Sequence, residues 1–279
     1  MGLIEQARAG RPAESVPVVR VWGGKTERGS DLVAGEEPLE IRIGGERVAV
    51  TMRTPVPGQD AELALGFVLA EGILGPDQIA RISECRSAEG DGGVADVLLR
   101  PGARPADGWQ RDFYATSSCG ICGKQSIEAV RAAAALVPDG PQVATTTLCA
   151  LPDALRARQR VFDRTGGLHA AALFTAAGDL IAVREDVGRH NAVDKLVGRA
   201  AMDGLLPLHE HVLMVSGRVS FEIVQKALAA GFPVVAAVSA PSSLAVRLAS
   251  ESNMTLVGFL RADAFNVYAG AGRIVRRRP

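Results

Sequence analysis

Two cysteines separated by two residues carry the most obvious chemistry in this sequence. Cys119 and Cys122 lie in the segment 116–124, which reads TSSCGICGK and precedes a helix expected over residues 126–137. At a helix N-terminus, unpaired backbone N–H groups and the helix dipole favour a thiolate over a thiol, and Lys124 adds a positive charge. A thiolate can attack a sulfur donor and hold the sulfur as a persulfide.

The Cys-x-x-Cys spacing by itself is compatible with four kinds of site. A redox dithiol of the thioredoxin type ranks first on spacing alone, although the surrounding sequence differs. A zinc site needs two more ligands, and Cys85 and Cys149 are each alone in their segments. A zinc deaminase needs an upstream His-x-Glu, but no histidine precedes His169, so we expect no zinc. In the fourth interpretation, the two cysteines only pack in a loop; Cys85 and Cys149 are expected to be core residues.

A polar segment later in the chain is a candidate for ligand contacts. Residues 184–195 read REDVGRHNAVDK and follow an apolar strand. A strand end, a glycine and a helix start would place Arg189, His190 and Asn191 where a phosphate or a ring can bind. The alternative is a solvated helix start with local ion pairs. His169, in the glycine-rich run TGGLHA, is expected to be a satisfied core histidine rather than a catalyst, with the wall of a pocket as a second interpretation.

The elements that position these residues alternate between strands and helices in the C-terminal half. In chain order, the expected strands and helices are 212–215, 221–230, 234–238, 244–250 and 255–260. This βαβαβ pattern predicts a parallel sheet with helices on its faces. Ligands of such sheets bind beyond the carboxyl ends of the strands. In this sequence those ends are residues 216–220, 239–243 and 261–265.

The first third of the chain is expected to be rich in β-strands. The expected strands are 16–22, 39–43, 48–52 and 94–99, with the second and third forming a hairpin. Asp60 is expected to cap a helix over residues 61–73. Residues 101–108 are rich in proline and glycine and form the best candidate for a linker.

Composition and charge narrow the classes of function. The chain has 279 residues, 47% apolar and 22% charged, with 31 basic and 31 acidic side chains. This balance favours neither a nucleic-acid nor a membrane partner, and no apolar run is long enough to span a bilayer. Residues 1–10 lack the apolar core of a signal peptide, and four cysteines are few for a secreted disulfide scaffold. We therefore expect a cytoplasmic protein.

Five motifs, in order along the chain, resemble the formate dehydrogenase accessory sulfurtransferases of the FdhD/NarQ family. They are SSCGICGK at 117–124, TGGLHAA at 165–171, REDVGRHN at 184–191, SGRVS at 216–220 and GFLR at 258–261. Each motif alone is weak, but five in the same order are highly specific. The resemblance covers roughly residues 115–268 and is weaker before them.

The resemblance implies both a fold and a function. The implied fold is α/β (α+β overall), with a β-rich N-terminal subdomain over residues 1–110 and a cytidine-deaminase-like α/β domain over residues 111–279. The implied activity is that of a sulfurtransferase, which takes sulfur from a cysteine desulfurase as a persulfide on Cys119, with Cys122 assisting. The sulfur passes to the molybdenum cofactor in its bis-guanine-dinucleotide form, Mo-bis(molybdopterin guanine dinucleotide), before that cofactor enters the formate dehydrogenase apoenzyme.

The same resemblance implies a cofactor site and an oligomeric state. The family's cofactor-binding stretch matches Phe259, Leu260, Arg261, Ala262, Asp263 and Ala264 in this sequence. A homodimer is implied as well. Two other functions stay open: a general thiol–disulfide oxidoreductase, which needs no desulfurase, and a non-catalytic cofactor chaperone, which needs neither cysteine.

Overall fold

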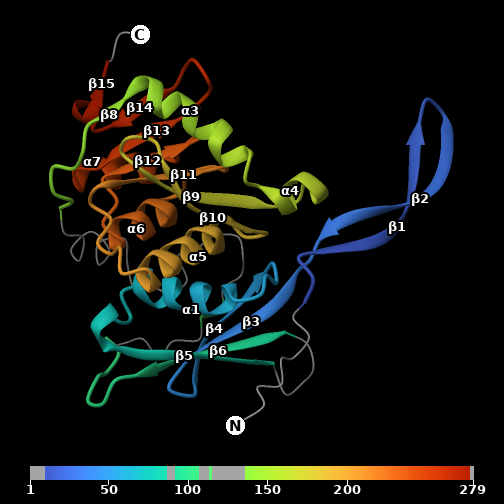
Figure 1. Cartoon of the computed structure of the whole chain (residues 1–279), viewed down its shortest axis with the longest axis horizontal. Helices are drawn as coiled ribbons and strands as arrows, with labels where there is room; N and C mark the ends of the chain where they lie inside the picture. Colours follow the sequence, from blue (N-terminus) through green and yellow to red (C-terminus); the bar gives the residue numbers. More distant parts are fainter. Residues whose placement is uncertain (1–9, 87–91, 107–112, 115–135, 277–279) are drawn as a thin grey trace.

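The computed structural model of the chain describes residues 10–86, 92–106, 113–114 and 136–276. Two β-sheets lie at opposite sides of the body, and helices α1 (Gln59–Ala70) and α5 (Arg189–Met202) pack against each other between them (Figure 1). Each sheet has its own buried apolar core. The mixed α/β class expected from the sequence is confirmed.

The sheet of the N-terminal part has five strands in the order β5-β6-β3-β4-β7. Its strands are β3 (Glu37–Ile43), β4 (Glu46–Arg53), β5 (Ile79–Arg86), β6 (Gly93–Leu99) and β7 (Phe113–Tyr114). β3 and β4 form the expected antiparallel hairpin, and Gly44 and Gly45 turn it with positive φ angles that favour glycine. Alternate residues of β3 are buried against α1, as the sequence pattern predicts.

Helix α1 begins and ends earlier than expected. Gly58, in the left-handed conformation, precedes its first residue, so Asp60 is not the N-cap. Asp60 instead pairs with Arg53 at the end of β4, with its Oδ1 2.8 Å from Nε. The helix ends at Ala70 because Gly72 reverses the chain with a φ of 68°. A short 3-10 turn, η1 (Pro76–Gln78), then leads into β5.

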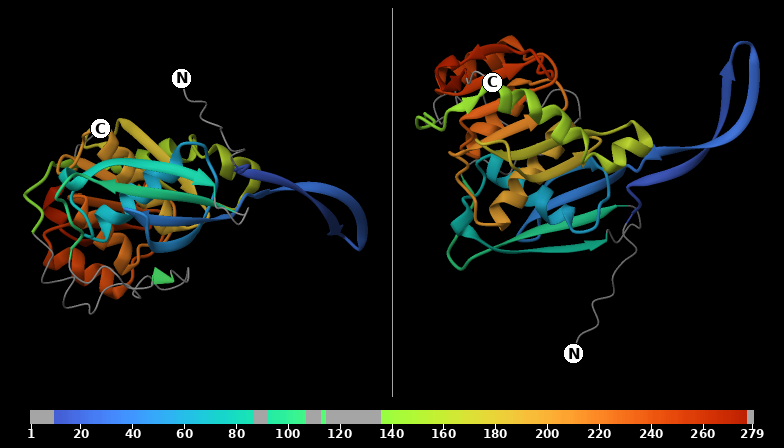
Figure 2. Two further views of the ribbon diagram at one scale, coloured as in Figure 1. Left: turned by 90° about the horizontal axis from the view of Figure 1, so that it is seen from below. Right: turned by 45° about the horizontal axis from the view of Figure 1, so that its top comes forward.

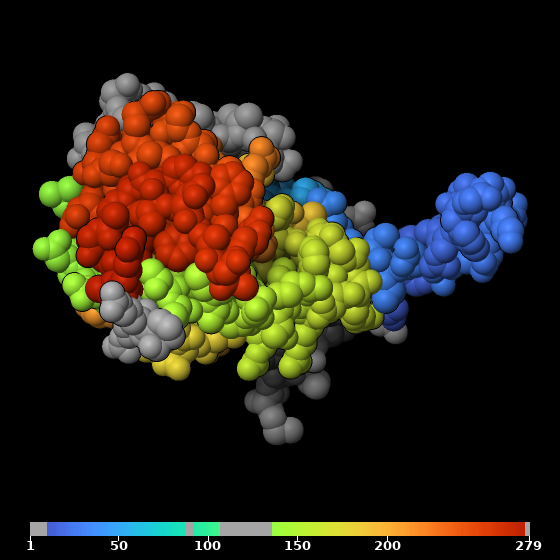
Figure 3. Space-filling model, turned by 90° about the horizontal axis from the view of Figure 1, so that it is seen from above, coloured from blue at the N-terminus to red at the C-terminus, as the bar shows by residue number. Residues whose placement is uncertain are grey.

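A long hairpin projects from the body near the N-terminus. It pairs β1 (Ala13–Trp22) with β2 (Lys25–Ala34) along their whole length, and it stands clear of the rest of the molecule (Figure 3). The sequence pattern indicated the first strand only, because β2 is mostly polar and lacks alternation. The base of the hairpin contacts α4 (Arg160–Thr165).

The C-terminal sheet has six strands in the order β10-β9-β11-β12-β13-β14. Its strands are β9 (His169–Thr175), β10 (Leu180–Asp186), β11 (His211–Val215), β12 (Val234–Ala237), β13 (Thr255–Gly258) and β14 (Asn266–Ala269). The three central strands β11, β12 and β13 are parallel, as predicted. The others run antiparallel to their neighbours, so the sheet is mixed.

Helices cover both faces of this sheet (Figure 2). One face packs against α3 (Thr145–Arg156), and the other against α5, α6 (Phe221–Ala229) and α7 (Ser243–Glu251). Side chains of β9 point alternately to the two faces of the sheet, so the strand contributes to both cores. Ala170 and Ala172 face α3, whereas Ala171 and Leu173 face α5. The remaining short elements are β8 (Val143–Ala144), η3 (Ala271–Arg273) and β15 (Ile274–Val275), with β8 and β15 paired in parallel.

Two glycines bring the backbones of α1 and α5 into direct contact. A Cβ atom at Gly66 would lie 1.8 Å from the carbonyl oxygen of Asp194, and one at Gly198 would lie 1.8 Å from that of Glu62. No side chain fits in such a space, so this crossing requires glycine on both helices. The contact joins the two sheets through their covering helices.

Two of the sequence-based expectations concern the chain as a whole. None of the helices in the described ranges is long and apolar enough to cross a bilayer. The expected boundary between residues 110 and 111 lies outside the described residues. The division into subdomains over 1–110 and 111–279 therefore stays a prediction.

Candidate functional site

The loops after the three parallel strands lie side by side at one edge of the C-terminal sheet. The N–H of Val219 donates to the carbonyl of Ala240 at 3.1 Å, and that of Phe259 donates to the carbonyl of Ser239 at 3.2 Å. A parallel bridge between Val219 and Pro241 joins the first two loops. The structure thus brings together the three segments, 216–220, 239–243 and 261–265, that the sequence placed at strand ends.

The loop after β13 presents most of its residues to solvent. Phe259 adopts a φ of 53°, which is rare for a residue with a side chain, and 44% of its surface is exposed. Arg261 holds the loop to the sheet, because its Nη1 donates to the carbonyl of Val238 at 2.6 Å. Ala262, Asp263 and Ala264 are exposed, whereas the side chain of Leu260 is fully buried. Cofactor binding by these six residues stays a prediction.

A cluster of positive charge lies beside the loop that follows β11. Arg189 and Arg218 are close enough to His169 for their charges to act on it, and a Cβ at Gly217 would lie 3.1 Å from His169 Nδ1. The pKa of His169 is lowered by burial first and by the two arginines second. The Nε of Arg189 is buried and has no hydrogen-bond partner among the described residues. Two guanidinium groups around a neutral imidazole favour an anion at this point.

His190 joins α5 to the same loop. Its Nε2 lies 3.1 Å from Ser220 Oγ, and the carboxylate of Glu222 lies 3.8 Å away. Burial, followed by the charges of Lys226 and Arg189, lowers the pKa of His190 to about 3, against a smaller opposing effect of Glu71. His190 is therefore neutral at physiological pH and orients the loop through a hydrogen bond.

The low pKa of His190 predicts a pH dependence of folding stability. The unfolded chain binds a proton at this residue below about pH 6.5 and the folded chain only near pH 3, so stability falls as the pH falls between these values. Replacing His190 with glutamine should reduce the loss of folding stability between about pH 7 and about pH 5. The midpoint of urea unfolding at each pH measures this stability. Equal losses in the wild type and in the variant would contradict this assignment.

Much of the polar segment 184–195 fastens the C-terminal sheet to β4 instead of facing a ligand. Asp186 accepts from the N–H of Thr54 at 3.1 Å and pairs with Lys195 at 2.6 Å, and both charged side chains are fully buried. Asn191, expected to lie at a ligand site, donates to the carbonyl of Met52 at 2.7 Å and is buried. The sequence could not show the partners Thr54 and Met52, because they lie more than a hundred residues away.

Two further buried ion networks join the same parts of the chain. Arg184 pairs with Glu62 of α1 through both carboxylate oxygens. Lys226 lies 2.9 Å from Asp194 and 3.0 Å from Glu71. Burial alone would lower the pKa of Lys226, but the two carboxylates together raise it. These pairs fix the relative position of α1, α5 and α6. The positions of Arg189 and Arg218 beside His169 depend on this arrangement.

The four cysteines fall into two groups. Cys119 and Cys122, the expected catalytic thiols, belong to residues 115–135, which lie outside the described residues. The expectation that Cys85 and Cys149 are core residues is wrong, because Cys85 is exposed on β5 and Cys149 is half-buried on α3. Burial and the charge of Asp263 raise the pKa of the Cys149 thiol, so it is a weak nucleophile.

The chain belongs to the FdhD/NarQ family, whose profile matches residues 34–275. It is 56% identical over 277 residues to the sulfur carrier protein FdhD of Streptomyces avermitilis, covering 96% of this chain and 98% of the relative. It is 55% identical over 255 residues to the protein of the same name from Mycobacterium tuberculosis, covering 88% and 92% of the two chains. The family resemblance of the five motifs is thereby confirmed.

A solved structure supports the fold. The chain resembles, with a TM-score of 0.74 and 22% identity, a protein from Desulfotalea psychrophila that was proposed to be a formate dehydrogenase accessory protein. The match covers 94% of this chain and 99% of that one. At this level of identity the likeness supports the arrangement of helices and strands and nothing finer.

Proposed function

We propose that this protein is a cytoplasmic sulfur carrier that serves formate dehydrogenase, with Cys119 as the residue that holds the sulfur. The observation that carries the proposal is the 56% identity, over nearly the whole chain, to a protein named a sulfur carrier. The Cys-x-x-Cys segment supports it, since the sequence predicts a helix start directly after the two cysteines and a thiolate in such a position is suited to accept sulfur. The raised pKa of Cys149 makes that thiol a poorer candidate, and Cys85 stands alone on β5, outside the Cys-x-x-Cys motif.

The proposed loading step is an exchange between thiol and persulfide. The Cys119 thiolate attacks the outer sulfur of a persulfide on a cysteine desulfurase. A new sulfur–sulfur bond forms on Cys119, the bond in the donor breaks, and the desulfurase leaves as a thiolate. No electron is gained or lost overall, so loading requires no added oxidant or reductant.

The proposed delivery step transfers the outer sulfur to molybdenum. Cys122 attacks the Sγ of Cys119, which releases the outer sulfur as hydrosulfide and leaves a Cys119–Cys122 disulfide. The two electrons on the released sulfur come from the two cysteines, so a dithiol reductant must reduce the disulfide before the next cycle. The acceptor is the molybdenum cofactor in its bis-guanine-dinucleotide form, which then enters the formate dehydrogenase apoenzyme.

The residues at the strand ends suit an acceptor of this kind. The exposed ring of Phe259 can stack on a purine base, and the carboxylate of Asp263 can accept from guanine N–H groups. Arg189, Arg218 and Arg261 supply cations for its phosphates. We further propose a cytidine-deaminase-like C-terminal domain over residues 111–279, an N-terminal subdomain over 1–110 and a homodimer.

Replacing Cys119 with alanine should abolish formate dehydrogenase activity in a bacterial strain whose own copy of this gene is deleted. The reason is that Cys119 is the proposed sulfur acceptor, and no thiol outside the Cys-x-x-Cys motif is expected to replace it. Activity of cell extracts with formate and a dye acceptor measures the effect, and circular dichroism of the purified variant checks that it folds.

Cys85→Ser is the matched control, because it removes an exposed thiol outside the motif and should leave activity unchanged. Normal activity with Cys119→Ala would overturn the proposal and favour a cofactor chaperone. Wild-type protein that supports full formate dehydrogenase activity in a host without a cysteine desulfurase, and that reduces a model disulfide through Cys119 and Cys122, would favour an oxidoreductase.

A further inference from the structure

The C-terminal sheet has an open edge at β10, whose only strand partner in the described part of the chain is β9. The N–H and carbonyl of Ala170 both hydrogen-bond to Ser216, so they point toward β11. Because these groups alternate in direction along a strand, the N–H and carbonyl of Ala172 also point toward β11. Val183, opposite Ala172, therefore directs its N–H and carbonyl away from β9. In agreement, the carbonyl of Val183 accepts from the side chain of Arg184 at 2.8 Å.

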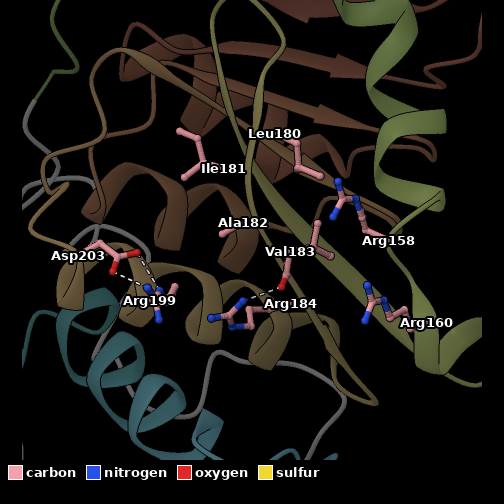
Figure 4. A pocket seen from close by; sticks show the side chains of 9 residues that line it. All are labelled: Arg158, Arg160, Leu180, Ile181, Ala182, Val183, Arg184, Arg199 and Asp203. Atoms are coloured by element: carbon pink, nitrogen blue, oxygen red, sulfur yellow. Dashed lines mark hydrogen bonds and ion pairs between the residues drawn. The ribbon is translucent and has the colours of Figure 1, made fainter.

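A groove of ≈ 380 Å³ runs along this edge. Its floor is the first part of β10, from Leu180 to Arg184. Arg158 and Arg160, from the connection between α3 and α4, lie on one side of the strand, and Arg199 lies on the other side (Figure 4). The edge is thus flanked by guanidinium groups on both faces of the sheet.

The charge of the groove is only partly neutralised. Arg184 is paired with Glu62, and Arg199 is paired with Asp203 at 2.6 Å. Arg158 and Arg160 are exposed and form no ion pair with any residue that the structure describes. The guanidinium groups of Arg158 and Arg160, from the connection between α3 and α4, therefore lie beside the backbone of β10 without an ion-pair partner in the described part of the chain.

We propose that the open edge of β10 is a docking site for an extended, acidic segment of a partner protein. Such a segment adds a strand beside Val183, and its alternate carboxylates meet Arg158 and Arg160. The exposed side chain of Ile181, 40% accessible and on the opposite side of the strand (Figure 4), offers apolar contact to the intervening residues of the segment. Charged side chains on an edge strand can also serve only to prevent self-pairing, but these two arginines lie on a different segment and point to the same groove.

The test is binding of a fluorescein-labelled peptide of alternating glutamate and valine to the full-length protein, measured by anisotropy at low and moderate salt. We expect saturable binding that weakens with salt, and a loss of about tenfold or more in the Arg158→Glu/Arg160→Glu variant. A peptide of alternating lysine and valine should not bind. The same acidic peptide with N-methylated backbone amides should bind more weakly, because it cannot pair along the strand.

Arg81→Glu is the matched control, since Arg81 is an exposed arginine on β5, the edge strand of the other sheet. It should bind the acidic peptide as the wild type does. Equal weakening by Arg81→Glu, equal binding of the N-methylated peptide, or no saturable binding would overturn the proposal. The oligomeric state of the Arg158→Glu/Arg160→Glu variant without peptide is measured as well. A difference from the wild type would also overturn the proposal, because it would assign the groove to a second copy of the chain.

Discussion

Replacing Gly198 with alanine is expected to destabilise the protein by roughly 2–3 kcal/mol, despite the higher helix propensity of alanine. The added methyl group would lie 1.8 Å from the carbonyl oxygen of Glu62, an atom of the α1 backbone that no side-chain rotation can move. The two helices must separate, and the buried pairs that they carry must stretch. The gain in helix propensity, about 1 kcal/mol, offsets only part of this cost.

Urea unfolding followed by circular dichroism measures this effect. The matched control is Gly272→Ala, because a Cβ at Gly272 meets no atom within 4 Å. Its stability should change by less than about 0.5 kcal/mol, as is usual for surface substitutions. Gly66→Ala, on the facing helix, should resemble Gly198→Ala. A Gly198→Ala protein as stable as the wild type would show that α1 and α5 do not cross with backbones in contact.

Replacing Lys195 with methionine is expected to cost about 3–5 kcal/mol, because it leaves Asp186 buried without its cation. Both side chains are fully shielded from solvent, with Nζ and Oδ2 2.6 Å apart. Lys195 also donates to the carbonyl of Thr54 at 2.9 Å, so the connection to β4 loses a second contact. The substitution should therefore weaken the link between the two sheets.

A surface pair and a double variant serve as controls for Lys195→Met. Arg42 pairs with Glu40 at 2.6 Å in a partly exposed position, and Arg42→Met should cost less than about 1 kcal/mol. The double variant Asp186→Asn/Lys195→Met should be less destabilised than the sum of its single variants, since it removes both charges. Costs that simply add would contradict a direct pair.

The sequence predicted the parallel core of the C-terminal sheet well, because its strands are short apolar runs bounded by turn residues. It also predicted the hairpin at Gly44 and Gly45. It missed the antiparallel strands β2 and β14. The residues of β2 are largely polar and exposed, and β14 has only four residues, so neither shows the apolar alternation that indicates a strand. The predicted start of α1 was also wrong. Asp60 is a residue type that often caps helices, but in this structure its carboxylate forms an ion pair with Arg53.

The candidate site was predictable in part for a similar reason. Strand ends and glycines marked the loops after β11 and β13, and each of these loops hydrogen-bonds to the loop after β12 at one edge of the sheet. The role of the polar segment 184–195 was not predictable, since Asp186 and Arg184 find partners in Thr54, directly after β4, and in Glu62 of α1, which are distant in the sequence. Local sequence gives no signal for the buried position of Asn191, or for the lack of an ion pair at Arg158 and Arg160 within the described ranges.

Peptide mass spectrometry after incubation with a cysteine desulfurase and free cysteine, without reductant, tests the central claim most directly. The account predicts one added sulfur atom on the peptide that contains Cys119, and none on the peptides that contain Cys85 or Cys149. An unmodified Cys119 peptide, or equal modification of the exposed Cys85, would contradict the claim that this protein carries sulfur on Cys119.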